Sequence, residues 1–193
     1  IEELQVKGPT VMKGYWKRPD ATAEVFTEDG WFRTGDQADL SDAGRIRIKG
    51  RIKEIIVTST GEKIPPTDME LAIQTDPLFE QVMVVGEARP FITALAVVNE
   101  AEWEKFAKEF NVDPSDDRML MRRDIRMAAL KRLKKAASRF PQYGIPRNIR
   151  LLKEHWTVDN GCLTVTMKLR RPIIREKLRA EIDELYTVPQ NNV

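Results

Sequence analysis

Histidine and cysteine, which often serve as catalytic bases, nucleophiles and metal ligands, are scarce in this sequence. It has one histidine, His155, and one cysteine, Cys162. A Ser/His/Asp triad is unconvincing, because only His155 is available as its base. One histidine and one cysteine also exclude a zinc site built from these residue types. We interpret His155 as a packed or surface imidazole and Cys162 as a small packed hydrophobe.

The glycines are too widely spread for a phosphate-binding loop. They lie at positions 8, 14, 30, 35, 44, 50, 61, 86, 144 and 161, and no two are closer than five residues. Dinucleotide-binding loops and P-loops both need several glycines close together. If the protein handles nucleotides, we expect most of the phosphate site to lie outside this sequence.

The composition indicates a packed core with a densely charged surface. Of 193 residues, 41% are hydrophobic and 32% are charged, and the net charge is +2. This length allows one domain or two small ones, and the charge balance excludes a wholly basic nucleic-acid coat protein. No apolar run approaches the roughly 18 residues of a membrane-spanning helix. The lone cysteine excludes an internal disulfide and favours a reducing compartment, so we expect a cytoplasmic protein.

The first 50 residues have the pattern of β-strands. Leu4 and Val6 alternate with polar residues, as do Ile46 and Ile48, and this period of two is typical of half-buried strands. Residues 41–44 between them favour a turn. This part of the chain is therefore predicted to be β-rich.

The rest of the chain mixes strands with helices. Apolar or β-branched runs predict further strands at residues 55–57, 81–86, 92–98 and 149–152. Thr67 is expected to be the N-cap of a helix, with Glu70 closing a capping box, and the helix should end near Thr75. The overall prediction is an α+β fold, in which a short mixed sheet is flanked by helices.

Helical spacing of apolar residues continues through residues 100–140 and again near the end. One face carries Trp103, Phe106, Ala107 and Phe110. A second helix is expected to open near Ser115 and to bury Met121, Ile125, Ala128 and Leu133. One last helix is expected to bury Ile174, Leu178, Ile182 and Leu185, with a frayed tail after Tyr186.

These helices carry opposite charges. Residues 100–117 hold seven acids and two lysines, a net of −5, whereas residues 122–139 hold eight bases and one acid, a net of +7. The simpler interpretation is two amphipathic helices with solvated faces. A binding module for an acidic protein, lipid or nucleic acid is the alternative. Nucleic acid is disfavoured, because no aromatic residues interleave the bases.

Three stretches of the chain carry specific motifs. The first ends in Gly30-Trp31-Phe32-Arg33-Thr34-Gly35-Asp36. The second begins Gly50-Arg51-Ile52-Lys53-Glu54 and runs through Thr60-Gly61-Glu62-Lys63-Ile64-Pro65-Pro66. The third is Asn160-Gly161-Cys162-Leu163-Thr164-Val165-Thr166-Met167-Lys168-Leu169-Arg170-Arg171. Together they span nearly the whole chain, and in this order they resemble the adenylate-forming (AMP-binding) enzyme superfamily.

The third stretch narrows the resemblance. Most members resemble Ser-Gly-Lys around the last lysine, whereas this chain has Thr166-Met167-Lys168. That pattern, and the helical segment 100–140, resemble the long-chain fatty acyl-CoA synthetases. The resemblance implies that ATP and a fatty acid give acyl-adenylate and pyrophosphate, and that CoA then gives acyl-CoA and AMP. Fatty acid metabolism and an acid–thiol ligase activity would follow.

The resemblance also implies that the chain is the C-terminal part of a longer enzyme. Residues 1–50 resemble the end of the large N-terminal AMP-binding domain, 51–53 the hinge, and 54–193 the C-terminal lid domain. The partner would be that N-terminal domain, which would hold the fatty acid and most of the ATP site, with Mg²⁺ bound to the ATP phosphates rather than to this chain. Ile1 opens the sequence without a signal segment, so we expect a processed or cut chain. Without the N-terminal domain, the chain is expected to be inactive alone. The full-length enzyme could associate peripherally with the inner membrane face.

Five residues match functional positions of the family. Asp36 and Arg51 match the residues that bind the ribose of ATP or AMP, since a carboxylate accepts from hydroxyls and a guanidinium donates in a fixed fork. Lys53 matches the hinge, Gly61 a glycine that faces CoA, and Lys168 the catalytic lysine. An ammonium at Lys168 would neutralise charge that builds as the carboxylate attacks the α-phosphate.

Each match has a plainer alternative. Asp36 and Gly61 could simply form turns, Arg51 and Lys53 could be surface residues, and Lys168 could belong to a solvated basic run. A different adenylate-forming activity is also open: a medium-chain or aryl acid–CoA ligase, or an enzyme that loads a carrier protein.

Overall fold

The computed structural model describes residues 3–42 and 44–187, and the chain divides into two compact units, Ile1–Ile55 and Ile56–Val193. The expected turn at 41–44 and the expected frayed tail fall partly outside the described residues. Among the described residues, no helix is both long and apolar enough to cross a membrane.

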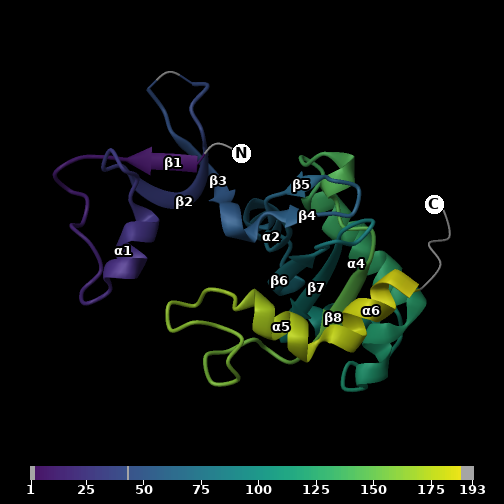
Figure 1. Ribbon diagram of the computed structural model, residues 1–193. Helices are drawn as coiled ribbons and strands as arrows, with labels where there is room; N and C mark the ends of the chain where they lie inside the picture. The colour runs from purple at the N-terminus through teal and green to yellow at the C-terminus, as the bar shows by residue number, and fades with distance from the viewer. Residues whose placement is uncertain (1–2, 43, 188–193) are drawn as a thin grey trace. The chain divides into compact units, whose positions relative to one another are not determined.

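The N-terminal unit is an antiparallel sheet in the order β1-β2-β3. Its elements are β1 (Glu3–Val6), α1 (Pro19–Val25), β2 (Phe32–Asp39), β3 (Arg47–Arg51) and the 3₁₀ turn η1 (Ile52–Glu54) (Figure 1).

Helix α1 was not predicted, although a proline at its first positions favours a helix start. The expected half-burial near β3 is wrong, because Ile46 and Ile48 are 59% and 51% exposed. Alternation indicates a strand but does not show that another layer covers it.

The C-terminal unit is built on a three-stranded mixed sheet in the order β6-β7-β8. Strands β6 (Phe79–Val85) and β7 (Thr93–Val98) are antiparallel, and β8 (Ile149–Leu152) pairs with β7 in parallel. The short strands β4 (Ile56–Val57) and β5 (Lys63–Ile64) form a separate antiparallel pair. The α+β prediction and all four strand predictions for this unit are confirmed.

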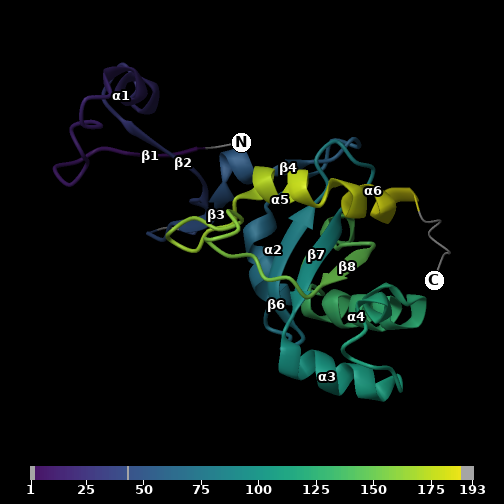
Figure 2. The same cartoon turned by 90° about the horizontal axis from the view of Figure 1, so that it is seen from below.

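Both faces of the β6-β7-β8 sheet are covered, as Figure 2 shows. One face packs against α2 (Pro66–Ile73), α3 (Glu100–Glu109) and α4 (Arg123–Ala136), and the other against α5 (Arg171–Lys177) and α6 (Arg179–Thr187). Each face of the sheet carries its own hydrophobic core. Successive residues of β6 alternate between them, with Val82 and Val84 in the first core and Met83 and Val85 in the second.

Three helix predictions need correction. The N-cap of α2 is Pro65, not Thr67, and no side chain caps the helix. The segment after Ser115 first forms the 3₁₀ turn η2 (Asp117–Met121), and Met121 is 37% exposed rather than buried. The last helix is two helices, because the backbone leaves the helical conformation at Leu178. A second 3₁₀ turn of this unit, η3 (Gln142–Gly144), follows α4.

The oppositely charged helices α3 and α4 are in contact. The guanidinium of Arg132 in α4 lies 5.5 Å from the ring centre of Phe106 in α3. Trp103, Phe106, Ile125 and Leu133 are buried, as the apolar spacing predicted. The basic face of α4 includes Lys134 and Lys135, which are exposed to solvent, as is Arg139 just after the helix.

Candidate functional site

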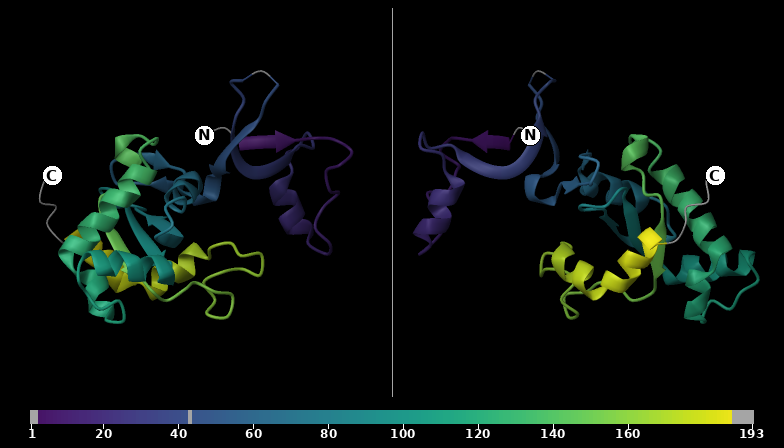
Figure 3. Two further views of the ribbon diagram at one scale, coloured as in Figure 1. Left: turned by 180° about the vertical axis from the view of Figure 1, so that it is seen from behind. Right: turned by 45° about the vertical axis from the view of Figure 1, so that its right-hand side comes forward.

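Lys168 lies on a tight loop that leads into α5. An antiparallel bridge between Leu163 and Leu169 closes the loop. Thr164 N donates to Lys168 O at 2.9 Å, and Met167 N donates to Thr164 O at 2.8 Å. The hydroxyl of Thr164 accepts from Lys168 N at 3.1 Å. The loop is therefore an ordered turn, which extends away from the sheet and helices of its unit (Figure 3).

The tip of this loop is open to solvent. Lys168 is exposed, and the apolar side chains beside it, Val165 and Met167, are 86% and 68% exposed. Met167 has a φ of 61°, a left-handed conformation that costs a non-glycine residue about 1–2 kcal/mol. No ion pair of Lys168 is found within residues 3–42 and 44–187. The ammonium is thus available to a ligand.

The stem of the loop is fastened to the body of the unit by two side chains. Asn160 Oδ1 accepts from Thr157 N at 3.0 Å and from Cys162 N at 3.2 Å, and Asn160 Nδ2 donates to His155 O at 2.8 Å. Gln81 of β6 accepts at Oε1 from Trp156 N at 2.7 Å and donates from Nε2 to Trp156 O at 2.9 Å. Neither anchor was predicted from the sequence.

A buried ion pair lies at the other end of the loop. Arg171, the first residue of α5, donates from Nη1 and Nη2 to the two carboxylate oxygens of Glu70 at 2.7 and 2.6 Å. Glu70 Oε1 also accepts from Val84 N of β6 at 2.8 Å. The side chains are 17% and 7% exposed. The expected capping role of Glu70 is therefore wrong.

Asp36 and Arg51 meet within the N-terminal unit. They are directly opposite each other on β2 and β3, and Arg51 Nε lies 3.0 Å from Asp36 Oδ1. Asp36 N also donates to Thr34 Oγ1 at 3.1 Å, and Gly35, with a φ of 73°, donates its N–H to Glu3 Oε1 at 3.0 Å. The two predicted ribose residues are thus brought together by strand pairing, with side chains 58% exposed for Arg51 and 28% exposed for Asp36.

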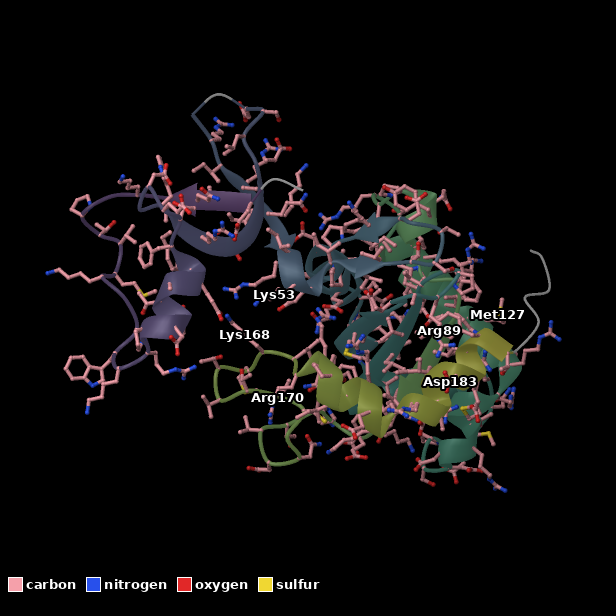
Figure 4. The ribbon with its side chains drawn as sticks, in the orientation of Figure 1. Lys53, Arg89, Met127, Lys168, Arg170 and Asp183 are labelled. Carbon is pink, nitrogen blue, oxygen red and sulfur yellow. The ribbon has the colours of Figure 1, made fainter. Side chains whose placement is uncertain are left out.

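Lys53 and Gly61 lie on backbone turns. Lys53 is exposed in η1. In the other unit, Figure 4 shows Lys168 and Arg170 on the loop before α5. Gly61 has a φ of +84° in a turn where its N–H donates to Thr58 O at 3.0 Å, and a Cβ added there would meet no atom within 4 Å. The space beside Gly61 is therefore open.

The Gly61 turn rests on the loop between β6 and β7. Ser59 N donates to the carbonyl of Arg89 at 2.9 Å. The guanidinium of Arg89 lies 4.8 Å from the ring centre of Tyr186 and forms an ion pair with Asp183 of α6. Burial raises the pKa of the Tyr186 phenol. This support joins the Gly61 turn to the last helix.

The single cysteine and the single histidine lie where a structural role suffices to explain them. Cys162 is buried, as expected. His155 is partly exposed, and its Nε2 lies 3.2 Å from Glu80 Oε1. Within the described part of the chain, no group of three histidine, cysteine, aspartate or glutamate residues could hold a metal ion.

Most of the chain matches a known protein family. The family model for the AMP-binding enzyme C-terminal domain matches residues 53–189. The chain belongs to this family. The resemblance carried by the three sequence stretches is therefore confirmed, and the AMP-binding C-terminal domain occupies most of the chain.

Curated relatives of this AMP-binding C-terminal domain are much longer proteins. The long-chain-fatty-acid–CoA ligase FadD15 of Mycobacterium tuberculosis is 36% identical over 192 residues, which are 95% of this chain and 31% of that protein. The chloroplastic long-chain-fatty-acid–[acyl-carrier-protein] ligase AEE15 of Arabidopsis thaliana is 33% identical over 194 residues, 95% of this chain and 25% of that protein. The chain thus spans less than a third of these relatives.

A solved structure shares the fold. The A-PCP didomain of carboxylic acid reductase from Segniliparus rugosus, in complex with AMP, superposes with a TM-score of 0.80 at 28% identity. The match covers 96% of this chain and 24% of that one. The mixed arrangement of small sheets and helices is therefore that of the C-terminal part of an adenylation domain.

Proposed function

We propose that this chain is the C-terminal part of an ATP-dependent, AMP-forming long-chain fatty acid–CoA ligase. The observation that carries the proposal is Lys168, an exposed lysine on an ordered loop at the position of the family's last lysine. The identity to a long-chain-fatty-acid–CoA ligase over nearly the whole chain supports the substrate class.

Lys168 would act in formation of the acyl-adenylate. Attack of a fatty acid carboxylate on the α-phosphate of ATP brings two anions together, and negative charge builds on the phosphate oxygens. An ammonium that reaches this position stabilises the transition state more than the separated reactants. The exposed ammonium on its projecting loop suits this role.

The other residues would bind substrates or permit movement. Asp36 would accept hydrogen bonds from the ribose hydroxyls and Arg51 would donate to the ribose. Changes of φ and ψ at Lys53 would let the lid adopt two poses: one presents Lys168 for adenylation, and the other presents the open backbone at Gly61 to CoA.

The N-terminal AMP-binding domain would supply the rest of the site, including the groups that hold ATP with its Mg²⁺ and the fatty acid. The chain alone should therefore make no acyl-adenylate. Pyrophosphate exchange by residues 1–193, compared with the full-length enzyme, tests this. Exchange by the isolated chain would contradict the proposal.

The decisive experiment separates the two half-reactions in the full-length enzyme. Lys168→Ala should slow acyl-adenylate formation by about 10²–10³-fold and leave thioester formation from supplied acyl-adenylate much less affected. Lys134→Ala, an exposed lysine on α4, is the matched control and should change neither rate. Equal loss of both half-reactions would overturn the assignment of Lys168.

A carrier protein is the second candidate acceptor. The 33% identity to an acyl-carrier-protein ligase and the structural match to a didomain that includes a carrier protein favour it. Supplying the full-length enzyme with either CoA or a carrier protein bearing a phosphopantetheine arm distinguishes the two. The proposal expects thioester on CoA, and transfer to the carrier protein alone would replace it with the second candidate.

A further inference from the structure

We propose that the buried pair Glu70–Arg171 is a positioning device that fixes where the Lys168 ammonium is delivered. The inference rests on the proposed role of Lys168 in adenylation. It gives Glu70 and Arg171 a role in one half-reaction, although they would act only through Lys168.

The geometry of the pair is that of a rigid joint. Two parallel hydrogen bonds of 2.7 and 2.6 Å join the guanidinium fork to the carboxylate, which fixes orientation as well as distance. A third hydrogen bond, 2.8 Å from Val84 N to Glu70 Oε1, ties the carboxylate to the central sheet. Arg171 therefore has a fixed place relative to α2 and β6.

Lys168 is only three residues from this joint. Between them, Arg170 N donates to Cys162 O at 2.8 Å, so the two strands of the stem are clamped together just before α5. Beyond the Leu163–Leu169 bridge, the loop has hydrogen bonds only within itself among the described residues, and its tip is exposed. The direction of Lys168 is thus set at the stem.

The nature of the pair also favours a positioning role over a purely stabilising one. A buried ion pair often contributes no more to stability than apolar residues of the same size, because both charges lose their hydration. Its geometric specificity is the larger benefit. Lysine at position 171 would keep the positive charge but lose the two-pronged fork, so Arg171→Lys should loosen the joint without leaving Glu70 as a lone buried charge.

The test uses the full-length enzyme and measures both half-reactions. Arg171→Lys should lower the maximal rate of acyl-adenylate formation by about 10–100-fold, since misplacement of a catalytic group by about 1 Å costs that much. The KM for ATP and the rate of thioester formation from supplied acyl-adenylate should stay within about twofold. Glu70→Gln, which can still accept from Val84 N, should give the same split.

A double mutant shows whether Arg171 acts through Lys168. If it does, Lys168→Ala/Arg171→Lys should be no slower in adenylation than Lys168→Ala alone. Glu184→Gln is the matched control, because it removes an ion pair of 3.1 Å between Arg150 and the exposed Glu184 of α6 that takes no part in the proposed site. Adenylation by Glu184→Gln should stay within about twofold of the unmodified enzyme.

Three results would overturn the inference. Additive losses in the double mutant would show that Arg171 does not act through Lys168. Equal losses in both half-reactions, with a lowered melting temperature, would show a general structural role. Unchanged adenylation in both Arg171→Lys and Glu70→Gln would show that the joint is not needed. If Lys168→Ala itself leaves adenylation unchanged, the proposed function fails, and the inference fails with it for that separate reason.

Discussion

Arg51 lies directly opposite Asp36 on the neighbouring antiparallel strand, with its Nε 3.0 Å from Asp36 Oδ1. The two residues are 15 positions apart in the sequence, and only strand pairing brings them together. Each constrains the side chain of the other, so a carboxylate acceptor and a guanidinium donor are presented side by side. A ribose, which both donates and accepts hydrogen bonds through its hydroxyls, suits such a pair.

Asp36→Asn should weaken binding of AMP by the full-length enzyme about 10-fold or more, because hydrogen bonds to a charged acceptor are stronger than those to an amide. Isothermal titration with AMP measures this. Asp39→Asn is the control, since Asp39 forms a comparable cross-strand pair with Lys49 at 2.8 Å. A similar loss of AMP affinity in both variants would show that removing any carboxylate charge from this sheet weakens binding, and would contradict a specific contact between Asp36 and the ribose.

Local patterns predicted most of the C-terminal fold. The strand at residues 149–152 was predicted with its observed bounds, because a short apolar run after Pro146 has few alternatives. The buried face of α3 followed from the spacing of Trp103 and Phe106. The predicted site residues came from the family resemblance, and the structure adds that Asp36 and Arg51 are in contact.

Long-range contacts could not be predicted in this way. Glu70 and Arg171 are 101 residues apart, and a glutamate near a helix start has a local explanation as a cap. That explanation failed because the sheet and α5 supply stronger partners. The break at Leu178 was missed for the same kind of reason, since the apolar spacing continues across it while the backbone does not.

Gly61→Ala should slow thioester formation more than adenylation in the full-length enzyme. The φ of +84° is strained for alanine, which should cost about 1 kcal/mol of stability, and the added Cβ would occupy the open space beside the turn. The rates of both half-reactions and the urea midpoint measure these effects.

Gly61→Asn separates strain from obstruction. Asparagine tolerates the left-handed conformation better than alanine, yet its side chain is larger. If Gly61 faces CoA, this variant should be the more stable of the two and the slower in thioester formation. Normal thioester formation by Gly61→Asn would contradict the CoA-facing assignment.

Truncating a side chain to alanine should affect stability very differently on the inner and outer faces of α4. Leu133 is fully buried, so Leu133→Ala should lower the free energy of unfolding by about 2–5 kcal/mol. Met127 lies on the outer face, 44% exposed, so Met127→Ala should change it by less than about 0.5 kcal/mol. Urea unfolding measures both. A large loss for Met127→Ala would mean that another part of the chain covers this face.

The ion pair between Asp76 and Arg132 should make stability depend on pH. Arg132 donates from Nη2 and Nε to the two oxygens of Asp76 at 2.5 and 2.9 Å, joining α4 to the turn before β6. Burial raises the pKa of the Asp76 carboxyl, but the hydrogen bonds from Arg132 and from Leu78 N lower it more, so the pKa lies below its usual range. The folded state therefore binds fewer protons at Asp76 than the unfolded state does.

Asp76→Asn should consequently destabilise the protein most at neutral pH, by about 1–3 kcal/mol. The contribution of Asp76 is complete above the unfolded pKa of about 3.9 and is lost as the pH falls through the lower pKa of the folded state. Urea unfolding of the unmodified protein and of Asp76→Asn, at about pH 7 and at successively lower pH, should show curves that converge below about pH 4. A difference that stays constant down to about pH 2 would show that the carboxylate charge does not carry the stabilisation.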